Sequence, residues 1–196
     1  MSIPLFTQLG FFHIIDAAAW DHLLFIAAMM APLSVKDVKM WFLALSSFTV
    51  GHSLAMAAQI ALALTLNSAM IEGMVLATLV FTAGRVVWFK GAPKTSRGKW
   101  FSAELLLALG FGLVHGLAFA KDLAPLLPTD AGGLWASWGW FALGIEGGQL
   151  LVVAAVFCLK WMASARGFNP KDFALILGAI CLGVSLHLAS QWYLEL

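Results

Sequence analysis

Apolar residues fill the chain in long runs that short polar segments interrupt. Six runs of about 20 residues or more carry few charges, over residues 10–33, 38–66, 69–89, 100–120, 134–163 and 172–194. An α-helix needs about 20 apolar residues to cross the roughly 30 Å hydrocarbon core of a bilayer. The pattern therefore predicts an all-α polytopic membrane protein, a bundle of about six transmembrane helices that forms a single domain over residues 1–196.

The polar segments between the runs are too short to be domains. The two longest, over residues 90–99 and 121–133, are rich in Gly, Pro and charged side chains, which is typical of turns and loops. The second and fifth runs are longer than a bilayer requires, so these helices are expected to tilt, to kink or to extend into the interface.

Composition narrows the classes of function. The chain is 62% hydrophobic and 11% charged, with a mean hydropathy of +0.92, values far from those of soluble domains. Eleven Lys and Arg residues against ten Asp and Glu residues give a net charge of +1. This charge balance offers no basic surface for nucleic acid. The high hydrophobic content makes the lipid bilayer the expected partner.

Basic residues gather in alternate loops. Nine lie in or beside the loops after the first, third and fifth runs: Lys36, Lys39, Lys90, Lys94, Arg97, Lys99, Lys160, Arg166 and Lys171. The opposite side has Lys121, while Arg85 falls inside a run, near enough to its end to reach the headgroups. Short basic loops tend to stay in the cytoplasm. Both termini are therefore predicted to lie outside the cytoplasm, in a protein of the bacterial inner membrane.

Five polar residues lie deep within the runs: Asp21, His22, His52, His115 and Glu146. Charged side chains at the bilayer centre cost at least about 2.5 to 3.5 kcal/mol each, so such residues usually have a function. At 1.5 Å per residue, the three histidines and Glu146 lie about 18 to 23 Å from the start of their runs. Four different helices are therefore expected to bring imidazole or carboxylate groups to one level of the membrane.

Imidazole and carboxylate together form a ligand set for a divalent transition metal. Asp21 is expected either to bind metal or to orient His22, and Gln149 is one helical turn from Glu146. His13 and Asp16 share a broad helix face with Asp21 and are expected to form an outer antechamber. His187 is equally deep but has no such neighbours, so we expect it to be a packing residue.

Four segments in this order resemble the signature blocks of the HupE/UreJ family of membrane proteins. They are HIIDAAAWDHLLF (residues 13–25), FTVGHSL (48–54), FGLVHGLAFA (111–120) and FALGIEGGQ (141–149). The family is associated with nickel and cobalt permeases that supply hydrogenases and ureases, and its members are small bundles of six or seven helices. The resemblance implies that its conserved blocks are matched by His13, Asp21, His22, His52, His115, Glu146 and Gln149.

The main hypothesis is a secondary transporter that moves a divalent metal, with Ni2+ favoured and Zn2+ or Co2+ as alternatives. Protons displaced from imidazole and carboxylate would make proton exchange a natural coupling. The alternative is an intramembrane zinc hydrolase acting on a lipid or peptide, because three histidines and a carboxylate also build such a centre. A third hypothesis is an assembly or sensing subunit with a structural metal, and a homo-oligomer remains open.

Overall fold

The computed structural model describes residues 3–16, 20–91, 97–128 and 130–195, so Lys94 lies outside the described residues. This part of the chain contains helices and no strand, which confirms the predicted all-α architecture. The helices are α1 (Ile3–Ile15), α2 (Trp20–Met30), α3 (Val38–Ala61), α4 (Ser68–Trp88), α5 (Arg97–Leu123), a 3-10 turn η1 (Ala124–Leu126), α6 (Ala131–Ala165) and α7 (Pro170–Leu194).

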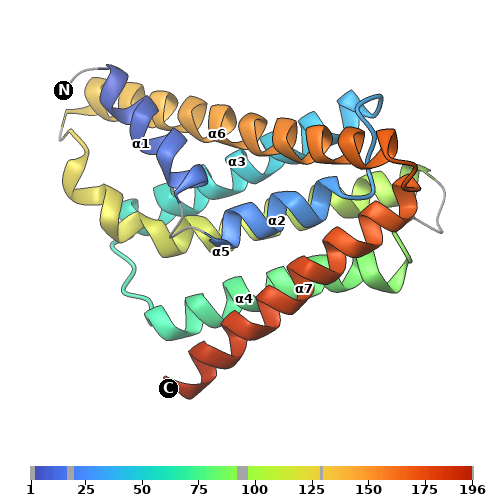
Figure 1. The fold of residues 1–196 in the computed structure, drawn as a ribbon. Coiled ribbons are helices and arrows are strands. Elements are labelled where there is room, and N and C mark those ends of the chain that lie inside the picture. Colours follow the sequence, from blue (N-terminus) through green and yellow to red (C-terminus); the bar gives the residue numbers. More distant parts are fainter. Residues whose placement is uncertain (1–2, 17–19, 92–96, 129, 196) are drawn as a thin grey trace.

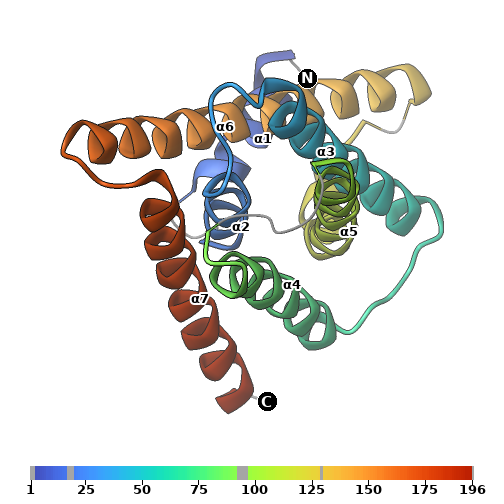
Figure 2. The same cartoon turned by 90° about the vertical axis from the view of Figure 1, so that its right-hand side faces the viewer.

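Five of the described helices, α3 to α7, are long and apolar enough to cross a membrane, and α1 with α2 makes a sixth span if the pair is counted as one. Figure 1 shows both ends of the chain at the same end of the bundle. We call that end the outer end and the opposite one the inner end, following the orientation predicted from the Lys and Arg residues. Figure 2, a view along the bundle, shows α2 near its middle.

The first apolar run differs from the expected continuous helix over residues 10–33. Helix α1 begins seven residues earlier than expected and ends at Ile15, α2 begins at Trp20, and the two are bent by 70°. Non-helical backbone at membrane depth is tolerated where it lines a cavity. At the start of α2, the His22 N–H donates a hydrogen bond to Asp21 Oδ1 at 2.8 Å, so one N–H group of this helix end is satisfied.

The other helix ends follow local signals. Helix α3 ends at Ala61 rather than at residue 66, and Asn67 begins α4 by accepting a hydrogen bond from the Met70 N–H at 3.1 Å. Asp130 caps α6 in the same way. Side-chain oxygens at this position satisfy N–H groups that the helix itself leaves unpaired.

Two pairs of parallel helices pack through glycine. A Cβ atom on Gly112 or Gly116 of α5 would overlap a backbone carbonyl oxygen of α3, that of Phe48 or of His52 respectively. A Cβ atom on Gly144 of α6 would likewise overlap a backbone carbonyl of α1. Small residues let membrane helices approach this closely. The close approach sets His52 of α3 beside the part of α5 that carries His115.

Two basic side chains of the inner half, Arg85 and Lys160, have partners within the bundle. Arg85 Nη2 lies 2.7 Å from Glu104 Oε1, with 14% and 5% of the side chains exposed, so Arg85 does not reach out to the headgroups as expected. Lys160 Nζ donates hydrogen bonds to the carbonyl oxygens of Ala31 and Leu33 at 2.8 and 2.7 Å. A cation at the end of α2 matches the negative end of the helix dipole and fixes the inner end of this short helix.

Candidate metal site

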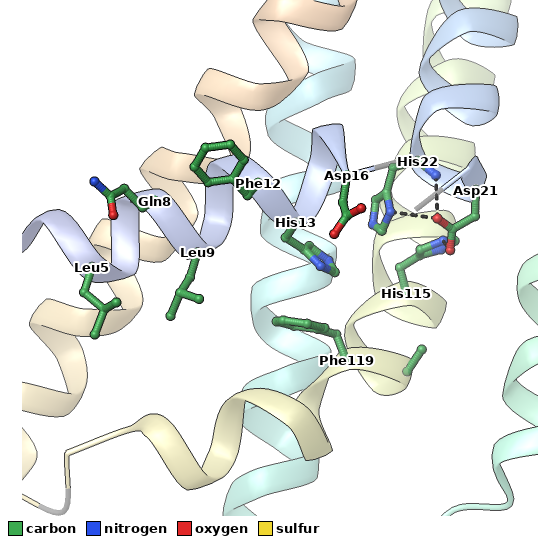
Figure 3. A pocket seen from close by; sticks show the side chains of 11 residues that line it. Leu5, Gln8, Leu9, Phe12, His13, Asp16, Asp21, His22, His115 and Phe119 are labelled. Atoms are coloured by element: carbon green, nitrogen blue, oxygen red, sulfur yellow. Dashed lines mark hydrogen bonds and ion pairs between the residues drawn. The ribbon is translucent and has the colours of Figure 1, made fainter. Parts of the chain in front are cut away.

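A cavity of about 660 Å³ follows α1 from its outer end to the break before α2 (Figure 3). Helix α5 supplies its other wall. The cavity is lined by Leu5, Gln8, Leu9, Phe12, His13, Asp16, Asp21, His22, His115, Ala118 and Phe119. It therefore connects the outer end of the bundle with two of the deep histidines predicted from the sequence.

Three histidines from three helices meet at the deep end of this cavity. His13 comes from the last turn of α1, His22 from the first turn of α2 and His52 from the middle of α3. One possible ligand atom of each lies within 4.8 Å of one such atom of the other two. The ring of His13 lies 4.6 Å from that of His22 and 5.4 Å from that of His52, measured between centroids. His13, expected in an antechamber, is thus part of the cluster itself.

Several nitrogen atoms of this cluster are buried without a hydrogen-bond partner in the part of the chain that the structure describes. They include Nε2 of His13, Nε2 of His22 and both ring nitrogens of His52. His52 is fully buried. A buried polar atom without a partner costs about 1 to 3 kcal/mol, so four of them in one place make a polar cluster that could hold a ligand. Imidazole nitrogens within this distance of one another suit a transition-metal ion.

Asp21 connects one further imidazole, that of His115, to the cluster through His22. Its Oδ2 accepts a hydrogen bond from His115 Nε2 at 2.8 Å, and its Oδ1 lies 2.9 Å from His22 Nδ1. Figure 3 shows Asp21 between these two rings. Asp21, His22 and His115 form a second group whose ligand atoms lie within 4.8 Å of one another. Asp21 can therefore orient His22 and His115, or bind a metal together with them.

The remaining candidate residues belong to neither of these two groups. Asp16 is exposed and lines the outer cavity. Glu146 Oε1 accepts a hydrogen bond from Ser46 Oγ at 3.2 Å, and Gln149 Oε1 accepts one from Thr49 Oγ1 at 3.4 Å. These two α6 residues thus face polar residues of α3. His187 is exposed on α7, outside both groups.

Aromatic rings enclose the histidines, a feature that the polar pattern of the sequence did not reveal. Phe119 lies 3.9 Å from the His13 ring, and Phe111 stacks on His115 at 4.0 Å. The sequence spacing could have indicated these rings, because Phe25, Phe48 and Phe111 each lie about one helical turn from a histidine in the sequence. Apolar rings keep water away, which strengthens electrostatic interactions at the site.

One family profile covers almost the whole chain. A profile described as HupE / UreJ protein matches residues 1–195. The chain belongs to the HupE/UreJ family. Its apolar helices and its family make it an integral membrane protein of a group connected with nickel and cobalt transport. No curated protein matches the chain, and no solved structure matches it either.

Proposed function

We propose that the protein is a secondary transporter that carries a divalent transition metal, with Ni2+ as the favoured ion and Co2+ or Zn2+ as alternatives. The supporting observation is the meeting of His13, His22 and His52, with unpaired ring nitrogens, at the deep end of a cavity open to the outer end. Metal would come in past Asp16, bind the histidines and leave toward the inner end.

The broken α1–α2 span supports transport. Substrate sites of many secondary transporters lie near the membrane midplane, where a discontinuous helix supplies ligands from the ends of two half-helices. Here α1 ends two residues after His13 and α2 begins one residue before Asp21. A small change in the angle between α1 and α2 would move His13 relative to His22 and alter the ligand set of the metal.

Proton exchange is part of the proposal. Imidazole must be deprotonated to bind metal, so binding releases protons and its affinity falls as pH is lowered. With the basic loops in the cytoplasm, the cavity would face the outside of a bacterial plasma membrane, and metal would move inward.

Polar side chains on both sides of the histidines favour transport over intramembrane hydrolysis. A hydrolase needs one opening for its substrate, whereas a transporter needs polar groups along a path in and a path out. The outer cavity supplies Gln8 and Asp16. On the inner side, Glu146 is hydrogen bonded to Ser46, six residues before His52 on α3. A hydrolase has no need of this inner polar pair.

Metal uptake into proteoliposomes tests the proposal. The wild-type protein should accelerate Ni2+ uptake over empty vesicles, and His52→Ala should abolish the gain because it removes a central ligand. His187→Ala is the matched control, since it removes an imidazole that lies on the exposed side of α7, and it should transport like the wild type. Wild-type vesicles that take up metal no faster than empty ones would refute the proposal.

A further inference from the structure

Three phenylalanines close the cluster on its inner side. Phe25 follows His22 by three residues on α2, while Phe48 and Phe111 precede His52 and His115 by four residues on α3 and α5. Because α2 runs inward and α3 and α5 run outward, each ring lies about one turn further in than its histidine. Phe25 stacks on Phe111 at 3.6 Å, and Phe48 lies 6.0 and 5.7 Å from these two rings. All three are at most 2% exposed. We call Phe25, Phe48 and Phe111 the aromatic barrier.

A row of hydroxyl groups on α3 passes beside this barrier. Ser46, Thr49 and Ser53 are spaced i, i+3 and i+7, so they share one face of the helix. Ser53 is next to His52, and its Oγ is buried without a hydrogen-bond partner among the described residues. The row therefore begins at the level of the histidines and runs inward past Phe48.

Helix α6 places an amide and a carboxylate opposite this row. Thr49 Oγ1 lies 3.4 Å from Gln149 Oε1, and Ser46 Oγ lies 3.2 Å from Glu146 Oε1. Gln149 is fully buried, and its Nε2 has no partner within the described part of the chain. Four polar side chains from two helices thus lie together in a region that is otherwise apolar.

Glu146 lacks a cationic partner within the described residues, whose ion pairs involve Asp21 and Glu104. A carboxylate within a span normally pairs with a cation, takes up a proton or marks an ion path. Along α3, Ser46 is six residues from His52, or about 9 Å at 1.5 Å per residue. Ligands of one metal ion lie about 2 Å from it, and neither group of possible ligand atoms within 4.8 Å of one another among the described residues includes Glu146. Glu146 and the histidines therefore do not hold the same ion in this arrangement.

We propose that Glu146, Ser46, Thr49 and Gln149 form a second cation position, which the metal occupies after it has left the histidines and passed the aromatic barrier. This inference rests on the proposed transport function. The second position offers oxygen ligands alone, which hold nickel-type ions less tightly than imidazole does. A weaker site on the inner side favours release, because conduction requires binding that is strong enough to admit an ion and weak enough to let it go.

The experiment separates metal binding from metal transport in the same protein. Co2+ serves as the binding probe, because its visible absorption spectrum reports its ligands, and Ni2+ uptake into proteoliposomes measures transport. Glu146→Gln keeps the size of the side chain and removes the charge. We expect its dissociation constant for Co2+ to stay within about twofold of the wild-type value and its Co2+ absorption bands to keep their positions. The rate of Ni2+ uptake should fall at least about tenfold. The retained spectrum also shows that the variant has folded.

Two further variants sharpen the result. Glu72→Gln removes an exposed carboxylate of α4 and should leave both binding and uptake unchanged, whereas Ser46→Ala should slow uptake with normal Co2+ binding. If Glu146→Gln loses Co2+ affinity in parallel with uptake, Glu146 belongs to the histidine site and the second position is refuted. Wild-type uptake in Glu146→Gln refutes it as well. In both cases the wild-type protein still transports, which distinguishes these outcomes from a failure of the proposed function.

Discussion

The close contact between α3 and α5 at Gly112 gives a sharp test of the packing that positions the site. In Gly112→Ala, the new methyl group would lie 2.9 Å from the His52 backbone nitrogen, 3.0 Å from the Phe48 carbonyl carbon and in overlap with the Phe48 carbonyl oxygen. Ordinary contacts of a Cβ atom begin near 3.4 Å. All three atoms belong to the backbone, so the two helices must move apart as rigid bodies.

The expected loss of stability follows from two opposing effects. Overpacking of this kind costs about 1 to 3 kcal/mol, and replacing a helical Gly with Ala returns about 0.5 to 1 kcal/mol. Gly112→Ala should therefore lower the free energy of unfolding by about 0.5 to 2 kcal/mol. Gly110→Ala is the matched control two residues away, where a Cβ atom meets nothing within 4 Å. It should raise the free energy of unfolding by up to about 1 kcal/mol.

Equilibrium unfolding in detergent, followed by circular dichroism, measures both variants against the wild type. The affinity for Ni2+ should fall in Gly112→Ala, because the helix that carries His52 is displaced, and should be unchanged in Gly110→Ala. If Gly112→Ala proved as stable as Gly110→Ala, the close backbone contact described between α3 and α5 would be refuted. The packing argument that places His52 beside α5 would then fail as well.

Three further predictions concern other parts of the molecule. Asp21→Asn should weaken metal binding about 10- to 100-fold, because partners that orient metal ligands contribute affinity of that size. Isothermal titration calorimetry with Ni2+ measures the affinity, and an unchanged value would remove Asp21 from the site. Glu104→Ala removes the carboxylate 2.7 Å from Arg85 and should lower the free energy of unfolding by about 3 kcal/mol or more in the same unfolding assay. A loss below about 1 kcal/mol would contradict a buried ion pair between these two residues. Reporter proteins fused after Gly91 and after Asp130 should report cytoplasmic and external positions respectively, and a report from the same side for both would contradict the six-span topology.

The helical spans could be predicted from the sequence because bilayer thickness sets the length of an apolar run. The break between Ile15 and Trp20 could not, since the intervening DAAA contains no Gly or Pro and Ala is the strongest helix former. The early end of α3 at Ala61 was hidden for a similar reason, because the residues after it are still apolar.

Depth along a helix could be counted from the sequence, but rotation and tilt could not. Counting placed His22, His52 and His115 at a common level, and the structure brings the His22 ring within 4.6 Å of the His115 ring and 6.4 Å of the His52 ring. The same counting placed Glu146 with them, yet its carboxylate contacts Ser46 instead. Helix α6 has 35 residues, far more than one bilayer crossing requires, so the depth of Glu146 does not follow from its distance to the helix start.

X-ray absorption spectroscopy of the Ni2+-loaded protein tests most directly whether the metal binds the histidine cluster. The structure predicts at least three imidazole nitrogens in the first coordination shell, visible as outer-shell scattering from the rings, and a loss of about one imidazole in His52→Ala. A wild-type spectrum with oxygen ligands alone, or one that His52→Ala leaves unchanged, would contradict the binding of metal by His13, His22 and His52.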